Sequence, residues 1–241
     1  KLSRFSEIKI DANFFDQHPN LESLDLSFLN SVISSCSSID LKALKNLKAL
    51  KSLNLSDNNL IIDKECEIFN LENLEFLDLS YSSKYLHNHQ IQEITLSETT
   101  FQRMKNLKCL NLKGNHIILE GNCFQHLKQL KQLDISKTIL RSDNNKDLEI
   151  FNSLKQLEKF EFDGIEPCDL FKLYRLSELI NLKELKINNI SEHDLDQFRE
   201  MLRSKRRKVG EEVHSTDPTH DDLCFFILRD LTNLTKLELT R

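Results

Sequence analysis

The sequence predicts an α/β solenoid, in which repeating coils stack with a parallel β-sheet on the concave face and irregular or short helical segments on the convex face. Three observations predict this fold. Leucine recurs at fixed spacing along nearly the whole 241-residue chain. The leucines alternate within each copy, and apolar residues recur every three positions ahead of it. Because one coil cannot bury its apolar side alone, only stacked coils form a core.

Each copy predicts one short concave strand. Leu53 and Leu55 alternate with a period of two, which is typical of a strand with one buried face. The Asn three residues later stands where the chain turns, and its amide can bond to turn backbone groups of its own coil and of the next. Two copies fit the template at every fixed position: Leu50-x-x-Leu53-x-Leu55-x-x-Asn58-x-Leu60 and Leu107-x-x-Leu110-x-Leu112-x-x-Asn115-x-Ile117. Weaker copies begin at Phe5, Leu21, Leu74, Leu130, Leu157, Leu182 and Leu234.

The segment ahead of each strand predicts the convex side. Apolar residues lie six and three positions before the strand, as Phe101 and Met104 do before Leu107. A spacing of three indicates a helical turn or an irregular segment that packs inward behind the sheet. We therefore expect these strand residues to be almost fully buried: Leu53, Leu55, Leu77, Leu79, Leu110, Leu112, Leu133 and Ile135.

The intervals between copies predict the organisation of the chain. We interpret residues 1–241 as a single solenoid of about nine repeats. The first interval is too short for a full coil, so the first copy is either truncated or misread. The polar residues 81–96 indicate an enlarged loop. Residues 203–222 combine a basic run with an acidic stretch and few apolar residues, which predicts a mobile excursion from the solenoid.

Composition and motifs exclude several function classes. The charged fraction of 29% and the apolar fraction of 39% are ordinary for a globular chain. A net charge of −5 argues against broad nucleic-acid binding, so no nucleic-acid partner is expected. No apolar run approaches the roughly 20 residues that span a bilayer. The sequence contains no phosphate-binding glycine loop, nucleophile elbow or zinc-protease motif, so we predict no catalytic, cofactor or metal site.

These repeats resemble the leucine-rich repeat family. Leu-Asp-Leu-Ser at 24–27 and 77–80, and Leu-Asn-Leu-Ser at 53–56, are similar to the ectodomains of vertebrate Toll-like receptors. The resemblance implies a leucine-rich repeat horseshoe that acts as a non-catalytic recognition module, outside the cell or at its surface. It implies a protein or protein–lipid ligand, with an accessory protein and a receptor dimer as further partners. Because Cys-rich caps are absent, an intracellular scaffold, adaptor or effector for protein–protein interaction is the alternative.

The outward residues of the concave strands are the candidate binding surface. Five of nine are acidic, although Asp and Asn are also the usual residues of the family at this position. Exposed aromatic residues nearby are typical of interface hot spots. The outward column contains Lys9, Asp25, Asn54, Asp78, Asn111, Asp134, Glu161, Lys186 and Glu238. We predict that the ligand-binding residues are Phe76, Asp78, Tyr81, Asn111, Gln132 and Asp134.

Two alternatives accompany this candidate site. Tyr81 can instead pack on its own loop, and the lateral or convex surface can instead hold the ligand.

Cysteines and glycosylation sequons bear on the cellular compartment. Cys123 is expected in the core, and Cys109 is expected to face solvent on the concave side, which favours a reducing compartment. The other four cysteines lie on connecting segments where disulfide bonds can form: Cys36, Cys66, Cys168 and Cys224. Three sequons predict glycosylation at Asn54, Asn189 and Asn233, although the sequence around Asn54 also matches the repeat consensus.

Overall fold

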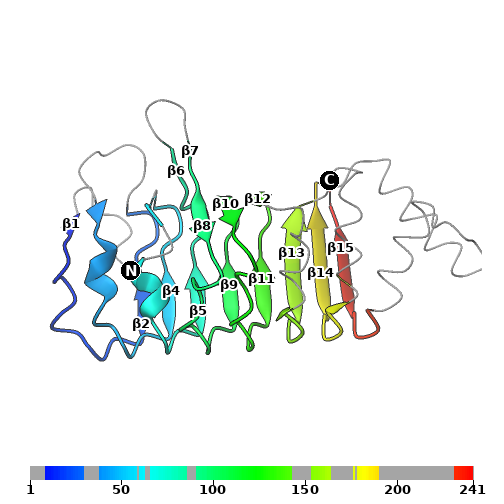
Figure 1. The fold of residues 1–241 in the computed structure, drawn as a ribbon, viewed down its shortest axis with the longest axis horizontal. Coiled ribbons are helices and arrows are strands. Elements are labelled where there is room, and N and C mark those ends of the chain that lie inside the picture. The colour runs from blue at the N-terminus through cyan, green and yellow to red at the C-terminus, as the bar shows by residue number, and fades with distance from the viewer. Residues whose placement is uncertain are drawn as a thin grey trace, which may run out of the picture.

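Stacked coils run along the long axis of the molecule, and most contribute one short strand to a continuous sheet (Figure 1). The structure is a computed structural model. It describes residues 9–29, 38–58, 60–62, 66–85, 91–142, 153–163, 176, 178–189 and 231–240. The excursion expected at 203–222 lies outside the described residues, as do Cys36, Cys168 and Cys224.

The main sheet is parallel throughout. Its eight strands follow the order β15-β14-β13-β11-β9-β5-β4-β2. The register aligns the second core position of every coil, so Leu53 stands between Leu24 and Leu77. The parallel concave sheet expected from the leucine pattern is therefore confirmed. The strands are β2 (Ser23–Asp25), β4 (Ser52–Asn54), β5 (Phe76–Asp78), β9 (Cys109–Asn111), β11 (Gln132–Asp134), β13 (Lys159–Asp163), β14 (Glu184–Asn188) and β15 (Lys236–Leu239).

The core lies between this sheet and the convex segments. All eight strand residues expected in the core are buried, and Ile135 is the most exposed of them at 6%. On the convex side lie the short 3-10 helices η1 (Leu41–Leu44) and η2 (Glu67–Asn70), together with irregular turns. The rings of Phe101 and Phe124 stack with centroids 6.0 Å apart and fill the space between two coils. Cys123 is fully buried, as expected.

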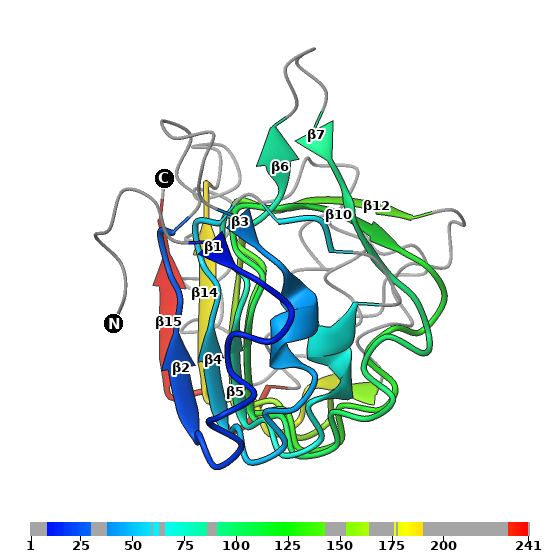
Figure 2. The ribbon, with the colours of Figure 1, turned by 90° about the vertical axis from the view of Figure 1, so that its left-hand side faces the viewer.

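Further strands lie outside the main sheet. A parallel three-stranded sheet joins β8 (Ile94–Leu96), β10 (His116–Leu119) and β12 (Ile139–Ser142), in the segments that lead away from the concave strands. The antiparallel pair β6 (Lys84–Tyr85) and β7 (Ile91–Gln92) protrudes from the solenoid (Figure 2). The enlarged loop expected at 81–96 therefore contains a strand pair and the start of this second sheet.

The first copy of the repeat was misread. Strand β1 (Lys9–Ile10) pairs with β3 (Ser38–Ile39) in a separate two-stranded sheet, so Lys9 does not belong to the concave column. Ile10 precedes the buried Phe15 by five residues, just as Ile39 precedes the buried Leu44. Because this spacing is that of the segment after a concave strand, β1 belongs to the returning part of a coil.

Candidate recognition surface on the concave sheet

The outward column predicted from the sequence forms one row across the main sheet. The register aligns its eight members strand by strand, and all eight are half-buried. Lys9 is the one predicted member that lies elsewhere. In sheet order the row reads Asp25, Asn54, Asp78, Asn111, Asp134, Glu161, Lys186 and Glu238.

The turn after each strand explains why Asp and Asn recur in this row. The Oδ1 atom of Asp78 accepts hydrogen bonds from the backbone N–H and the hydroxyl of Ser80, at 2.8 and 2.6 Å. Asn54 makes the same two bonds with Ser56, at 3.0 and 2.8 Å. The turn therefore needs a side-chain oxygen, which either residue supplies, and it does not need the charge. Asp25 with Ser27, and Asp134 with Ser136, repeat the arrangement.

Two rows of three residues from β5, β9 and β11 meet at the centre of the face. Phe76 stands level with Cys109 and Gln132, and Asp78 stands level with Asn111 and Asp134. The predicted site residues on these strands therefore lie together. With Tyr81, which follows β5, they form the central patch: Phe76, Asp78, Tyr81, Asn111, Gln132 and Asp134.

One hydrogen bond and the burial of one carboxyl group determine the electrostatics of the central patch. The amide of Asn111 donates a hydrogen bond to Oδ2 of Asp78 at 3.0 Å, so that both carboxylate oxygens of Asp78 are bonded. Burial raises the pKa of Asp134, with a further contribution from Glu161, against the lowering effect of the bonds from Ser136. The patch thus presents a partly desolvated acidic surface beside an aromatic ring.

Cys109 is less accessible than expected. It is half-buried within the sheet, and its thiol donates a weak hydrogen bond to Oε1 of Gln132 at 3.7 Å. Burial, helped by Asp78, raises the pKa of the thiol to about 11. Because the thiolate is the reactive form, this cysteine is protected at neutral pH. Cys109 thus lies on the outward side of the concave sheet, as expected, but it is only partly exposed, and the reducing compartment stays a prediction.

Tyr81 packs on the neighbouring coil. It has a left-handed backbone with φ 53°, and a side-chain Cβ placed at Gly114 would overlap its ring. The ring is nevertheless 40% exposed. Tyr81 thus rests on the next turn, and its outer side stays open to a partner.

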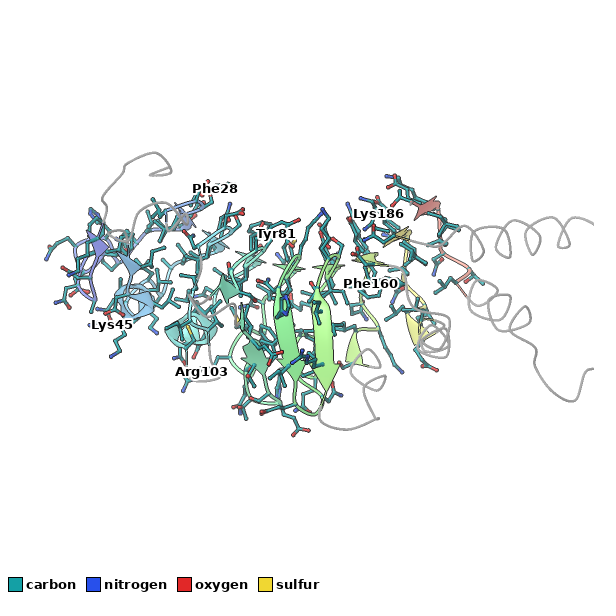
Figure 3. The ribbon with its side chains drawn as sticks, turned by 90° about the horizontal axis from the view of Figure 1, so that it is seen from above. Phe28, Lys45, Tyr81, Arg103, Phe160 and Lys186 are labelled. Atoms are coloured by element: carbon teal, nitrogen blue, oxygen red, sulfur yellow. The ribbon has the colours of Figure 1, made fainter. Side chains whose placement is uncertain are left out.

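Phe28 and Asp57 occupy the equivalent turn position in earlier coils, with φ 61° and 57°. Figure 3 shows Phe28 and Tyr81 projecting on the same side of the solenoid, opposite to Lys45 and Arg103. Sequence reasoning missed these two residues. The available signal was their place three residues after Asp25 and Asn54, as Tyr81 stands after Asp78.

At the end of the row formed by β13, β14 and β15, charged side chains form ion pairs. Lys186 donates to Oε1 of Glu161 at 2.8 Å, and the amide of Asn188 donates to the same oxygen at 3.1 Å. The bond with Glu161 raises the pKa of Lys186. A hollow of about 100 Å³ lies here across three strands. Its lining consists of Lys159, Phe160, Glu161, Glu184, Leu185, Lys186, Lys236 and Glu238.

Ion pairs also join the coils along the edge where the strands begin. Glu22 pairs with Lys51 at 2.8 Å, and Glu75 pairs with Lys108 at 2.7 Å. Glu158 accepts bonds from Lys183 and Lys131, which lower the pKa of its carboxyl to about 2. These groups are solvent-exposed, so each pair contributes little to stability.

The three sequons differ in accessibility. Asn54 is half-buried, and its Oδ1 is bonded to Ser56. Asn189 and Asn233 are exposed, and their amides donate to Asp163 Oδ2 and to the carbonyl of Ile180, each at 2.7 Å. A glycan at Asn54 would stand on the concave face, whereas Asn189 and Asn233 lie away from the central patch.

Within the described residues, no group of three or more His, Cys, Asp or Glu side chains is placed to hold a metal ion. No helix in this part of the chain is long and apolar enough to cross a membrane.

Comparison with known proteins finds receptor-like relatives. CD180 antigen of Mus musculus is 32% identical over 158 residues, which cover 57% of this chain and 23% of the relative. Toll-like receptor 8 of Homo sapiens is 32% identical over 183 residues, which cover 59% and 17%. Transforming growth factor beta activator LRRC33 of Danio rerio is 33% identical over 96 residues, which cover 39% and 13%. The chain therefore spans less than a quarter of the length of each relative.

Structural and family comparisons agree on the fold. The TLR13–ssRNA13 complex contains a chain that aligns with 96% of this chain over 30% of its own length, with 22% identity and a TM-score of 0.52. Since that neighbour is bound to RNA, the expectation of no nucleic-acid partner stays a prediction. A family model described as leucine rich repeat matches residues 85–140. The repeat template, the parallel sheet and these matches together show a leucine-rich repeat fold, and the chain resembles the ectodomains of Toll-like receptors.

Proposed function

We propose that the chain is a non-catalytic recognition module, the ligand-binding portion of an innate-immune receptor ectodomain of Toll-like type. The central patch carries this proposal, because the register brings its aromatic, acidic and amide side chains together on three neighbouring strands. A rigid sheet that holds side chains in fixed rows lowers the cost of ordering them on binding. The similarity to Toll-like receptor 8 and CD180 antigen supports a receptor role and a location outside the cell or at its surface.

The chemistry of the central patch favours a protein partner, alone or carrying a lipid. Phe76 supplies apolar area, and Asp78 and Asp134 select basic groups on the partner. An accessory protein that presents the lipid, and a dimer of the receptor, belong to the same proposal.

Glycosylation tests the compartment. The full product of the gene is expressed in mammalian cells, and its mass is compared before and after glycosidase treatment. We expect a mass shift that Asn189→Gln or Asn233→Gln reduces, because both side chains are exposed. If the full product and its variants show no shift at all, the intracellular scaffold becomes the better interpretation.

Substitution in the central patch tests the site. A surface partner is identified by proximity labelling and purified, and its association with the wild-type chain is measured at two salt concentrations. The double variant Asp78→Asn with Asp134→Asn keeps both turn oxygens and removes both charges. We expect slower association with a weaker dependence on salt, because charge steers the encounter.

Phe76→Ala should lower the affinity about tenfold as the loss of an aromatic contact. Phe14→Ala is the matched control, since Phe14 is an exposed aromatic residue that precedes the concave sheet. Unchanged affinity in all central-patch variants, with circular dichroism like that of the wild type, would place the site on another surface.

A further inference from the structure

Phe28, Asp57 and Tyr81 form a continuous row along the turns that follow β2, β4 and β5, which we call the aromatic ridge. Their backbone N–H groups donate to carbonyls of the next coil: Phe28 to Ser56 at 3.0 Å, Asp57 to Ser80 at 2.9 Å, and Tyr81 to Lys113 at 2.7 Å. These bonds continue the strand pairing of the main sheet. Neighbouring turns are therefore about 4.8 Å apart, and the two aromatic residues stand roughly 10 Å apart with Asp57 between them.

Packing within the chain leaves much of the aromatic ridge exposed. The side chains of Phe28 and Tyr81 are 55% and 40% exposed. Both residues adopt a left-handed backbone, which glycine accepts freely and bulky residues do not. The ring of Tyr81 is held in place by the surface of Gly114. Two aromatic rings are thus exposed at positions where the left-handed backbone favours a smaller residue. This arrangement is typical of a binding surface.

The surroundings of the aromatic ridge are negative. Burial and the nearby Asp78 raise the pKa of Asp57. Two lysines of the following coils whose side chains the structure describes are directed elsewhere or distant. Lys113 acts on Asp134 and Glu161. Lys137 occupies the equivalent position three turns beyond Asp57, roughly 14 Å away, which exceeds the screening length in physiological salt.

We propose that the aromatic ridge is a docking site for an arginine side chain of a protein partner. The guanidinium contacts the carboxylate of Asp57 and stacks on the exposed ring of Phe28, and Tyr81 flanks Asp57 on the other side. A planar guanidinium suits this position better than a lysine ammonium, because it stacks on rings and is more weakly hydrated. The inference rests on the proposed function in taking the partner to be a protein. It differs in its residues, since Phe28 and Asp57 lie outside the central patch.

The experiment uses the whole 241-residue chain and a fluorescent peptide with three arginines spaced by glycine and serine. Binding is measured by fluorescence anisotropy, together with two peptides in which lysine or the neutral isostere citrulline replaces arginine. We expect the arginine peptide to bind most tightly and the citrulline peptide most weakly. Phe28→Gly and Asp57→Asn should each weaken binding of the arginine peptide about two- to fivefold, as the loss of one exposed cation–π or charge contact.

Folding and binding can be separated at this position. Phe28→Gly relieves a left-handed backbone, so its melting temperature should stay equal to that of the wild type or rise while its affinity falls. Lys137→Gly is the matched control, because it relieves the same backbone conformation at an exposed turn outside the aromatic ridge. It should keep the affinity of the wild type.

Two results would overturn the aromatic ridge as an arginine site. One is equal binding of the arginine and citrulline peptides. The other is loss of peptide binding in Phe76→Ala and Gln132→Ala with full binding in Phe28→Gly, which would move the basic segment to the central patch and leave the proposed function standing. The proposed function is tested separately, by the association measurement with the purified partner.

Discussion

Asn115, which is buried, and Thr138, which is half-buried, stand in successive turns and differ in how many backbone groups they satisfy. The amide of Asn115 donates to the carbonyls of Leu79 and Leu112, at 2.8 and 2.7 Å. Its oxygen accepts from the backbone N–H groups of Ser82 and Ser83, at 2.7 and 2.8 Å. Asn115→Ala leaves these groups without that partner, so we expect a loss of about 2–4 kcal/mol in the free energy of unfolding, measured with urea.

Thr138→Ala is the control for this prediction. Its hydroxyl donates to the same carbonyl of Leu112 at 3.0 Å, with a longer contact to Ser136 at 3.3 Å, and it accepts nothing that Asn115 accepts. We expect a loss of about 1 kcal/mol, that of an ordinary hydrogen bond. Equal losses in the two variants would contradict the assigned role of the Asn amide.

Gly114 is required by both its backbone and its neighbour. Its φ is +69°, and an added Cβ would overlap the ring of Tyr81. We expect Gly114→Ala to cost about 1–2 kcal/mol from the backbone alone, and more from the overlap. In a double-mutant cycle, Gly114→Ala should cost less in a Tyr81→Ala background. Additive losses would show that the ring and the glycine do not interact.

At the scale of the element, the turn after β11 predicts that the stability of the fold depends on pH. Burial raises the pKa of Asp134 above its ordinary value of 3.8, so the folded state holds a proton that the unfolded chain has already lost. Retaining this proton stabilises the folded state relative to the unfolded state. The contribution is complete below pH 3.8, and it is lost as the pH rises through the pKa that Asp134 has in the folded state. Asp134→Asn keeps the acceptor for Ser136 and removes the penalty of burying the charge.

The Asn variant should therefore melt at a higher temperature than the wild type at pH 7, and the difference should vanish near pH 3.5. The comparison requires thermal unfolding of both proteins at the two pH values. An advantage that is equal at both would mean that the charge of Asp134 is not its cause.

The elements that could be predicted are those with a local periodic signal. Alternating leucines specify the concave strands, and Asn58 and Asn115 bond to their turns as expected. Strands such as β8, β10 and β12 were not predicted, because they lie outside the alternating leucine template and their sequences, ITL, HIIL and ILRS, differ from one another. Asn13 follows Phe5 by eight residues, as Asn58 follows Leu50, but it is exposed because β1 is not a concave strand.

The candidate site also contains a part that the sequence predicts and a part that it does not. Its rows could be predicted, because register follows from the repeat. Of the aromatic ridge only Tyr81 was predicted, since Phe28, Asp57 and Tyr81 share a position in the repeat and a backbone conformation but not a residue type.

At the scale of the whole molecule, each coil is stabilised by its neighbours, so protection should be uneven along the solenoid. Leu110 in β9 is buried between two coils, whereas Leu237 and Leu239 in β15 are only partly buried. In the 241-residue chain we expect slower native-state hydrogen exchange for β9 amides than for β15 amides. Equal protection would indicate that the chain opens only as a single unit.

In the turn after a concave strand such as β4 or β5, either Asn or Asp can supply the side-chain oxygen. Since Asp78 and Asn54 make the same bonds to the serine that follows, a change of one nitrogen for one oxygen alters the charge of the face and leaves the turn intact. A lineage can therefore make this surface more or less acidic, coil by coil, through single substitutions that keep the hydrogen bonds of the turn. Where the carboxylate is desolvated, as at Asp134, the same substitution also changes the stability of the fold.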